Sequence, residues 1–384
     1  MATIPSRRLR GWKLALFVAS IAVLLLFSLI ALPFVIAEPF ERVVDEARAK
    51  GIPGSYAEAG RRQDARRQRI TNEMASLLAA VSLYEFGRPD PMMRTAVHPE
   101  RVRLYREVPT ATVQRALAST HELRAIDWSP RPGRWDRGEH ALATKLIPLL
   151  CDRWLVEQFE DPDAEAALLI ELARSFDPLW GDWRRIPVLL ALRPRLADLR
   201  DKEALADRLR RFADERRPEF IHAAEARFAQ LAEFLRRPEE EAKDRGLSLP
   251  RIADGPSRLH ALVRLGGAEV LRHGIRSIEG VRTMRDPVVL EAHLKASIPT
   301  EISAGRILHG MAGAWESHFL QSAVHVEMLA RTLAWRLDGK EHPIDQWDPA
   351  KRPLRSLERD GRIVALYSVG HDGHDHGGVA GKDL

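Results

Sequence analysis

The sequence contains a single cysteine, Cys151. An intramolecular disulfide and a cluster of thiolate metal ligands are therefore both excluded. Cys151 lies in an apolar stretch with helical spacing, so we expect it to be a small buried side chain. Catalytic motifs are also lacking, because the chain has no Gly-x-Ser-x-Gly, no Gly-x-x-x-x-Gly-Lys and no His-Glu-x-x-His. These absences favour a protein without a catalytic centre, although they do not decide whether it is an enzyme.

A large excess of basic over acidic residues, or the reverse, is lacking as well. The 384 residues include 59 Lys and Arg against 54 Asp and Glu, a formal net charge of +5. Basic and acidic residues alternate closely, as in ADRLRRFADERRPEF, which is typical of the solvated face of helices with i,i+4 ion pairs. We find no basic segment interleaved with aromatic side chains that could stack bases. We therefore expect no nucleic-acid partner.

One long hydrophobic run is present, from Leu14 to Ala37, and it contains no charged residue. About 20 apolar residues suffice for a helix to cross the hydrocarbon core of a bilayer. Four basic residues precede the run, and the first acidic residue is Glu38. The positive-inside rule then predicts a single-pass anchor over residues 14–37, with residues 1–13 in the cytoplasm and the rest of the chain extracytoplasmic, on the periplasmic side.

A cleavable signal peptide is the alternative, because Val-Ile-Ala before Glu38 resembles a cleavage site. The apolar region of a signal peptide spans about 7–15 residues, which is shorter than this run. We therefore favour an uncleaved anchor that binds the lipid bilayer.

The remainder of the chain is predicted to be mainly α, because apolar residues recur with helical spacing over residues 38–337. Asp161 and Pro162 form a typical helix start, an N-cap followed by proline. Loops rich in Pro and Gly at 127–138 and 246–257 mark two candidate subdomain boundaries. Strand-like alternation is predicted only near the end, where an Asp-Gly turn indicates a β-hairpin within 338–370, followed by a Gly/His/Asp tail over 371–384.

Two terminal segments carry a resemblance to known proteins. FERVVDEARAKGIPGSYAEAG and DPAKRPLRSLERDGRIVALYSVGHDGHDHGG together resemble a group of uncharacterised membrane-anchored proteins of the planctomycete type. In that group an anchor precedes a Gly-x-Pro segment and a helical body, and the chain closes with a YSVGxDGxDDGG-like ending. The ending is also similar to the C-terminus of type II secretion pseudopilins, where it leads into a calcium-binding loop. His374 and His376 stand where that ending is usually acidic or neutral, which argues against calcium binding. The pseudopilin processing site is lacking, so we do not expect a pilin-like subunit.

The tail offers the first candidate metal site, formed by His371, Asp372, His374, Asp375 and His376. The carboxylates and the glycine carbonyls could supply oxygen ligands to Ca²⁺, whereas the imidazoles could hold Zn²⁺. The alternative is a half-buried strand that ends in a polar terminal loop. We favour that alternative and predict no cofactor, because Gly-rich terminal tracts do not hold ligands in fixed positions.

A second candidate is one face of a predicted helix that carries Glu316, His318, His325 and Glu327. His318 and His325 are seven residues apart and therefore share a face, where they could bind a metal or handle a proton. Residues of this kind are more often half-buried and hydrogen-bonded locally.

A third candidate is a set of tryptophans expected on loops, Trp128, Trp135, Trp180 and Trp183. Loop tryptophans on an extracytoplasmic domain could stack sugars or anchor a partner, but filling the core is the commoner role, and we favour it here.

Three hypotheses follow from these features. The first is a non-enzymatic binding or scaffold component of the cell envelope, with an envelope protein as its partner. The second is an envelope metal-binding protein or enzyme that uses the His318/His325 face or the His371–His376 loop. The third is glycan binding through the loop tryptophans. The anchor and the lack of catalytic motifs favour the first.

Overall fold

The computed structural model describes residue 20 and residues 39–55, 57–59, 99–123, 149–174, 182–237, 258–298, 323–360, 362–370 and 374–378. These parts are mainly helical and include one small antiparallel sheet of two strands, which confirms the predicted class. Residues 149–156 are also helical. The named helices are α2 (Phe40–Ala49), α5 (Pro99–Arg106), α6 (Thr110–Leu123), α8 (Pro162–Arg174), α9 (Asp182–Leu192), the 3₁₀ helix η2 (Arg193–Asp198), α10 (Lys202–Arg236), α12 (Arg258–Thr283), α13 (Pro287–Ser297) and α16 (Val324–Asp338).

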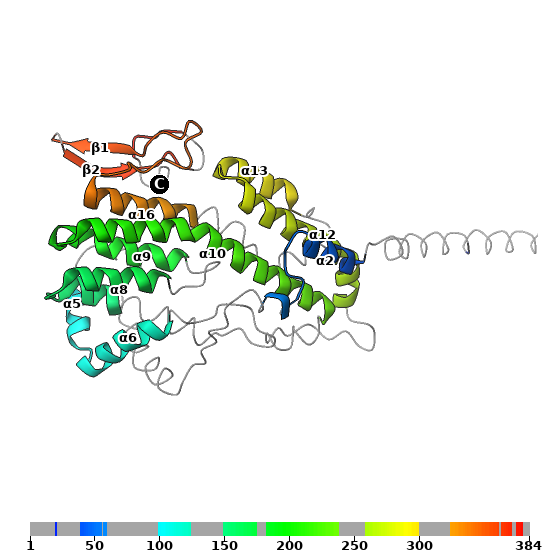
Figure 1. Cartoon of the computed structure of the whole chain (residues 1–384), viewed down its shortest axis with the longest axis horizontal. Helices are drawn as coiled ribbons and strands as arrows, with labels where there is room; N and C mark the ends of the chain where they lie inside the picture. The colour runs from blue at the N-terminus through cyan, green and yellow to red at the C-terminus, as the bar shows by residue number, and fades with distance from the viewer. Residues whose placement is uncertain are drawn as a thin grey trace, which may run out of the picture.

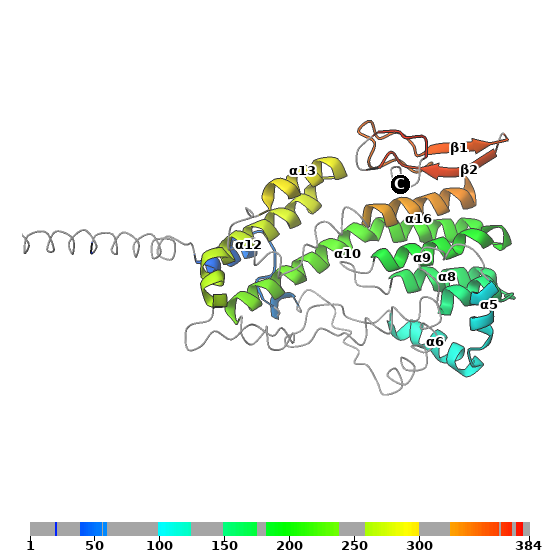
Figure 2. The same cartoon turned by 180° about the vertical axis from the view of Figure 1, so that it is seen from behind.

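The longest described element is α10, with 35 residues. At a rise of about 1.5 Å per residue, it is about 50 Å long. Figure 1 and Figure 2 show α10 running through the body, with α2 and α12 at one end and α8 and α9 beside its other half. α16 lies against α10 on the side that faces the sheet.

Two hydrophobic cores share α10. The first core contains Leu209 and Phe212 of α10, packed with α8, α9, residues 149–156 and part of α16. The second core contains Phe220 and Phe228 of α10, packed with α2, α12, α13 and residues near the C-terminus. Cys151 is buried in the first core, as predicted. The sharing of one helix makes the two cores parts of a continuous body.

Aspartate side chains cap the N-termini of three of the described helices. Asp161 accepts a hydrogen bond from the Ala164 backbone N–H (3.0 Å) at the start of α8, as the sequence predicted. Asp201 does the same for α10, and Asp286 for α13. Each satisfies a backbone donor that the first helical turn leaves without a partner.

The C-terminal hairpin is also present. It consists of β1 (Arg355–Arg359) and β2 (Arg362–Tyr367), which pair antiparallel with a bulge between Leu357 and Glu358. Asp360 in the turn has a φ of +53°, the left-handed conformation expected where Asp and Gly join two strands. The last part of β2 packs on the body, since Leu366 contacts the second core, whereas Ile363 near the start of the strand is exposed.

The expected anchor at 14–37 lies outside the described residues, apart from Ser20. Among the helices that the structure describes, none combines the length and the apolar character needed to cross a bilayer.

Candidate functional site

The segment after α16 forms a short closed loop that holds two buried aspartates. An antiparallel bridge joins Ile344 to Pro353, and the Asp345 backbone N–H donates to the Arg352 carbonyl (2.8 Å). Each aspartate also accepts from the backbone N–H two residues further on, Trp347 (3.0 Å) for Asp345 and Ala350 (2.8 Å) for Asp348. Such Asx turns hold both carboxylates by hydrogen bonds within the loop itself.

Asp345 connects this loop to the end of β2. Its side chain is 0% exposed. The Ser368 hydroxyl donates to Oδ1 (2.6 Å) and the Val369 backbone N–H donates to Oδ2 (2.9 Å). With Trp347 these donors satisfy a carboxylate that would otherwise be costly to bury.

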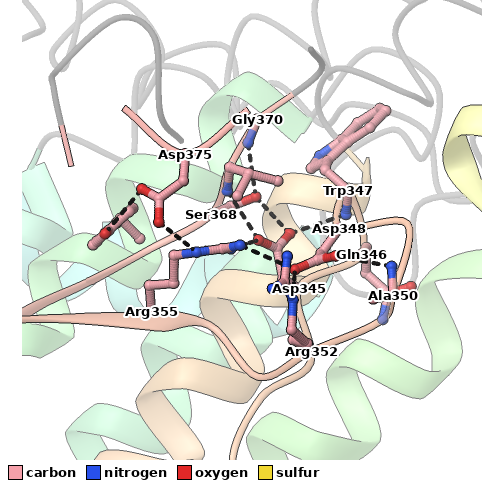
Figure 3. Close-up of polar contacts among 12 residues, drawn as sticks. Asp345, Gln346, Trp347, Asp348, Ala350, Arg352, Arg355, Ser368, Gly370 and Asp375 are labelled. Carbon is pink, nitrogen blue, oxygen red and sulfur yellow. Dashed lines mark hydrogen bonds and ion pairs between the residues drawn. The ribbon is translucent and has the colours of Figure 1, made fainter. Parts of the chain in front are cut away.

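Arg355, at the start of β1, contacts three aspartates at once (Figure 3). Its Nη1 lies 3.4 Å from Asp345 Oδ2, its Nη2 lies 3.2 Å from Asp348 Oδ2, and its Nε lies 2.8 Å from Asp375 Oδ2. Asp375 also accepts from the Tyr367 hydroxyl (3.1 Å) and the Gly377 backbone N–H (2.9 Å). We call Asp345, Asp348, Arg355 and Asp375 the carboxylate–arginine network.

The network connects three segments of the chain. Its guanidinium lies among the three carboxylates and contacts each of them. Arg352 also donates to Asp348 (2.7 Å), and this hydrogen bond lowers the pKa of Asp348 although burial acts in the opposite direction. The network therefore joins the loop after α16, the hairpin and the tail through ion pairs and hydrogen bonds.

The predicted tail site is described only in part, because His371 and Asp372 lie outside the described residues. His374 is exposed, His376 is half-buried, and Asp375 is bound to Arg355 and Tyr367. Within the described residues, no group of three or more His, Cys, Asp or Glu is placed to hold a metal ion.

The predicted helix face is also described in part. Glu316 and His318 lie outside the described residues. His325 is half-buried in the first turn of α16, and Glu327 accepts a hydrogen bond from Arg331 (3.2 Å) one turn later. Positions 325 and 327 do not share a helix face. The structure therefore does not bring these two residues together.

Of the four tryptophans, Trp128, Trp135 and Trp180 lie outside the described residues. Trp183 belongs to the first turn of α9 and not to a loop, because the helix begins at Asp182. Two other tryptophans, Trp154 and Trp347, are 1% exposed and belong to the first and second cores.

No known protein family, curated protein or solved structure matches this chain.

Acid is expected to destabilise the protein below about pH 4. The hydrogen bonds from Arg352 and Arg210 lower the pKa of Asp348 and of Asp338 respectively, relative to an unfolded value of about 3.9. The stability that these groups contribute is therefore fully present above the unfolded pKa, and it is lost as the pH falls through the lower pKa of the folded state. Urea midpoints measured from pH 6 to pH 2 test this, and the D348N variant should show a weaker dependence. An identical dependence in D348N would contradict the role of Asp348.

Proposed function

We propose that this chain is a single-pass anchored protein of the cell envelope, whose helical extracytoplasmic body is a non-enzymatic binding or scaffold component. The apolar run at 14–37 and the basic residues before it support the anchor and its orientation. The body then begins almost at once, because α2 starts at Phe40.

The observation that carries the proposal is the way in which α2 is fixed to the body. Val43, Val44 and Ala47 are at most 1% exposed and belong to the second core. Glu41 accepts from Arg236 at the end of α10 (2.9 Å), and Lys50 contacts Glu279 of α12 (3.1 Å).

A body joined to its anchor by a packed helix keeps its orientation relative to the bilayer. The part of the body around the first core then lies at the other half of α10, a helix about 50 Å long. The surface of that part can bind partners at a set distance from the membrane. This geometry suits a scaffold. Asp375, the carboxylate of the tail motif that lies among the described residues, is bound by Arg355 and Tyr367, which also favours a structural role for the motif.

Cross-linking of intact cells with a membrane-impermeant reagent tests the orientation and the binding together. We expect the full-length protein to be cross-linked to a reproducible, small set of envelope proteins. A variant without residues 1–37 is the matched control, and it should give none of these products. Failure of the full-length protein to react would contradict the extracytoplasmic placement, and reaction without cross-linked partners would contradict the scaffold. In that second case the purified protein would be assayed for bound metal and glycan.

A further inference from the structure

A tight turn over residues 51–55 follows α2. The helix ends in a Schellman motif, in which the Ile52 N–H donates to the Ala47 carbonyl (2.8 Å) and the Gly51 N–H donates to the Arg48 carbonyl (3.0 Å). Gly51 has a φ of +75°, the left-handed conformation that this motif requires. Ile52 is 0% exposed and belongs to the second core. The turn is therefore packed on the body.

Gly54 is the residue at which the turn approaches α2 most closely. A Cβ atom at this position would lie 2.5 Å from Cγ1 of Val44, a distance that forces one of the two groups to move. Val44 is 0% exposed in the second core, where close packing leaves it little room. The Gly54 N–H donates to Glu58 Oε2 (2.7 Å), and the Gly54 carbonyl accepts from Arg236 Nη1 (2.8 Å). A larger residue would therefore push the turn away from both side chains.

Arg236, the last residue of α10, joins this turn to the start of α2. Its Nε and Nη2 donate to the two carboxylate oxygens of Glu41 in the first turn of α2 (2.9 and 3.1 Å). Its Nη1 donates to the Gly54 carbonyl and to Glu233 of α10 (3.2 Å). A guanidinium that binds a carboxylate through two parallel hydrogen bonds fixes orientation as well as position. One side chain of α10 therefore holds both ends of the segment that contains α2 and the turn.

Glu58 connects the same turn to the end of α2. Its carboxylate accepts from Arg48 Nε (3.1 Å) as well as from the Gly54 N–H. Burial acts to raise the pKa of Glu58, but the hydrogen bonds from Arg48 and Gly54 outweigh it and lower the pKa. Glu58 is therefore ionised at neutral pH and pairs with Arg48. We call residues 51–55, Glu58 and Arg236 the α2 clasp.

We propose that the α2 clasp is a conformational device that couples the membrane anchor to the body, an inference that rests on the proposed function. With the clasp closed, α2 is held on α10 through Glu41 and through the turn, so the anchor and the body move together. An isolated helix of ten residues is not stable in water, so α2 depends on such contacts. With the clasp open, α2 keeps its contacts with α12 and changes its tilt against α10, while the two cores stay folded.

Distances between pairs of spin labels, measured by double electron–electron resonance on the full-length protein in lipid nanodiscs, test this coupling. Labels introduced through R42C in α2 and R211C in α10 report on the joint, because both side chains are exposed. Labels introduced through R211C and K295C, in α10 and α13, report on the body itself. Cys151, the single native cysteine, is replaced in the C151A background.

Both label pairs should give a narrow distance distribution in the parent protein. R236Q and G54A should each widen the α2–α10 distribution about twofold or more and leave the α10–α13 distribution unchanged, because local opening requires less free energy than global unfolding. The matched control is R276Q, which removes an exposed arginine of α12 outside the clasp and should leave both distributions unchanged.

An α2–α10 distribution that stays narrow in R236Q and G54A would overturn the proposal, and so would a broad distribution in the parent protein. Widening of both distributions in the two variants would also overturn it, because the clasp would then hold the whole body together and not the joint alone.

The cross-linking experiment separates this inference from the proposed function. If the parent protein captures partners and the variants keep the narrow α2–α10 distribution, the scaffold stands and the clasp is wrong. If the variants widen that distribution and the parent protein captures no partner, the clasp stands and the scaffold is wrong.

Discussion

Replacement of Arg355 by methionine is expected to lower the free energy of unfolding by about 3 kcal/mol. Methionine keeps much of the side-chain volume but removes the guanidinium that Asp345 and Asp348 share, while Asp348 keeps its hydrogen bond from Arg352. Those two side chains are 0% and 1% exposed. Removal of one partner from a buried ion pair typically costs about 3–5 kcal/mol, because the remaining charge stays buried. Arg355 is 18% exposed, which places the expected loss at the lower end.

Urea unfolding of the full-length protein, followed by circular dichroism, measures this loss. Arg359→Met is the matched control, because Arg359 lies on the same strand and is exposed. We expect that substitution to change stability by less than about 0.5 kcal/mol. Equal effects of the two substitutions would mean that the network contributes no more than any surface charge on the hairpin.

The helices and the hairpin could be predicted because their signals are local. Asp161 and Pro162 begin α8 as their residue types indicate. The Asp-Gly pair between two segments of alternating apolar and polar residues likewise predicted the hairpin. The helical spacing of apolar residues over 38–337 agrees with the burial of Phe220 and Phe228 in α10. Periodicity alone could not reveal that this one helix would continue over 35 residues through two cores, because that depends on contacts with distant segments.

The carboxylate–arginine network was not predicted, although its residues were visible in the sequence. Asp345 and Asp348 have the sequence pattern of turn residues. An Asx turn is a local feature, so it does not indicate which cation will contact the carboxylate. That partner, Arg355, comes from the following strand, and Asp375 follows 20 residues later. The Gly/His/Asp tail suggested a metal site. In the structure its Asp375 instead binds the guanidinium of Arg355 in the same chain. The four residues of the network are only some of the charged residues in this closing segment, so the sequence alone did not single them out.

The second large effect concerns the two cores, which we expect to unfold together. Phe212 in the first core and Phe220 in the second are 1% and 0% exposed, and both belong to α10. Truncation of a buried phenylalanine to alanine costs about 3–5 kcal/mol through lost burial and the cavity that remains. Most of the stability of a helix in a protein comes from its packing, so a core that melts also releases the shared helix from the other core.

F212A and F220A should therefore each shift one common unfolding transition of the full-length protein to lower urea. Far-ultraviolet circular dichroism and tryptophan fluorescence should give the same midpoint in both variants, because coincident probes indicate a single cooperative unit. The matched control is L357A, which truncates a side chain of the hairpin that is 43% exposed and should have a much smaller effect. Two resolved transitions, of which F212A moves one and F220A the other, would show that the cores are independent. In that case α10 would connect two units that unfold separately.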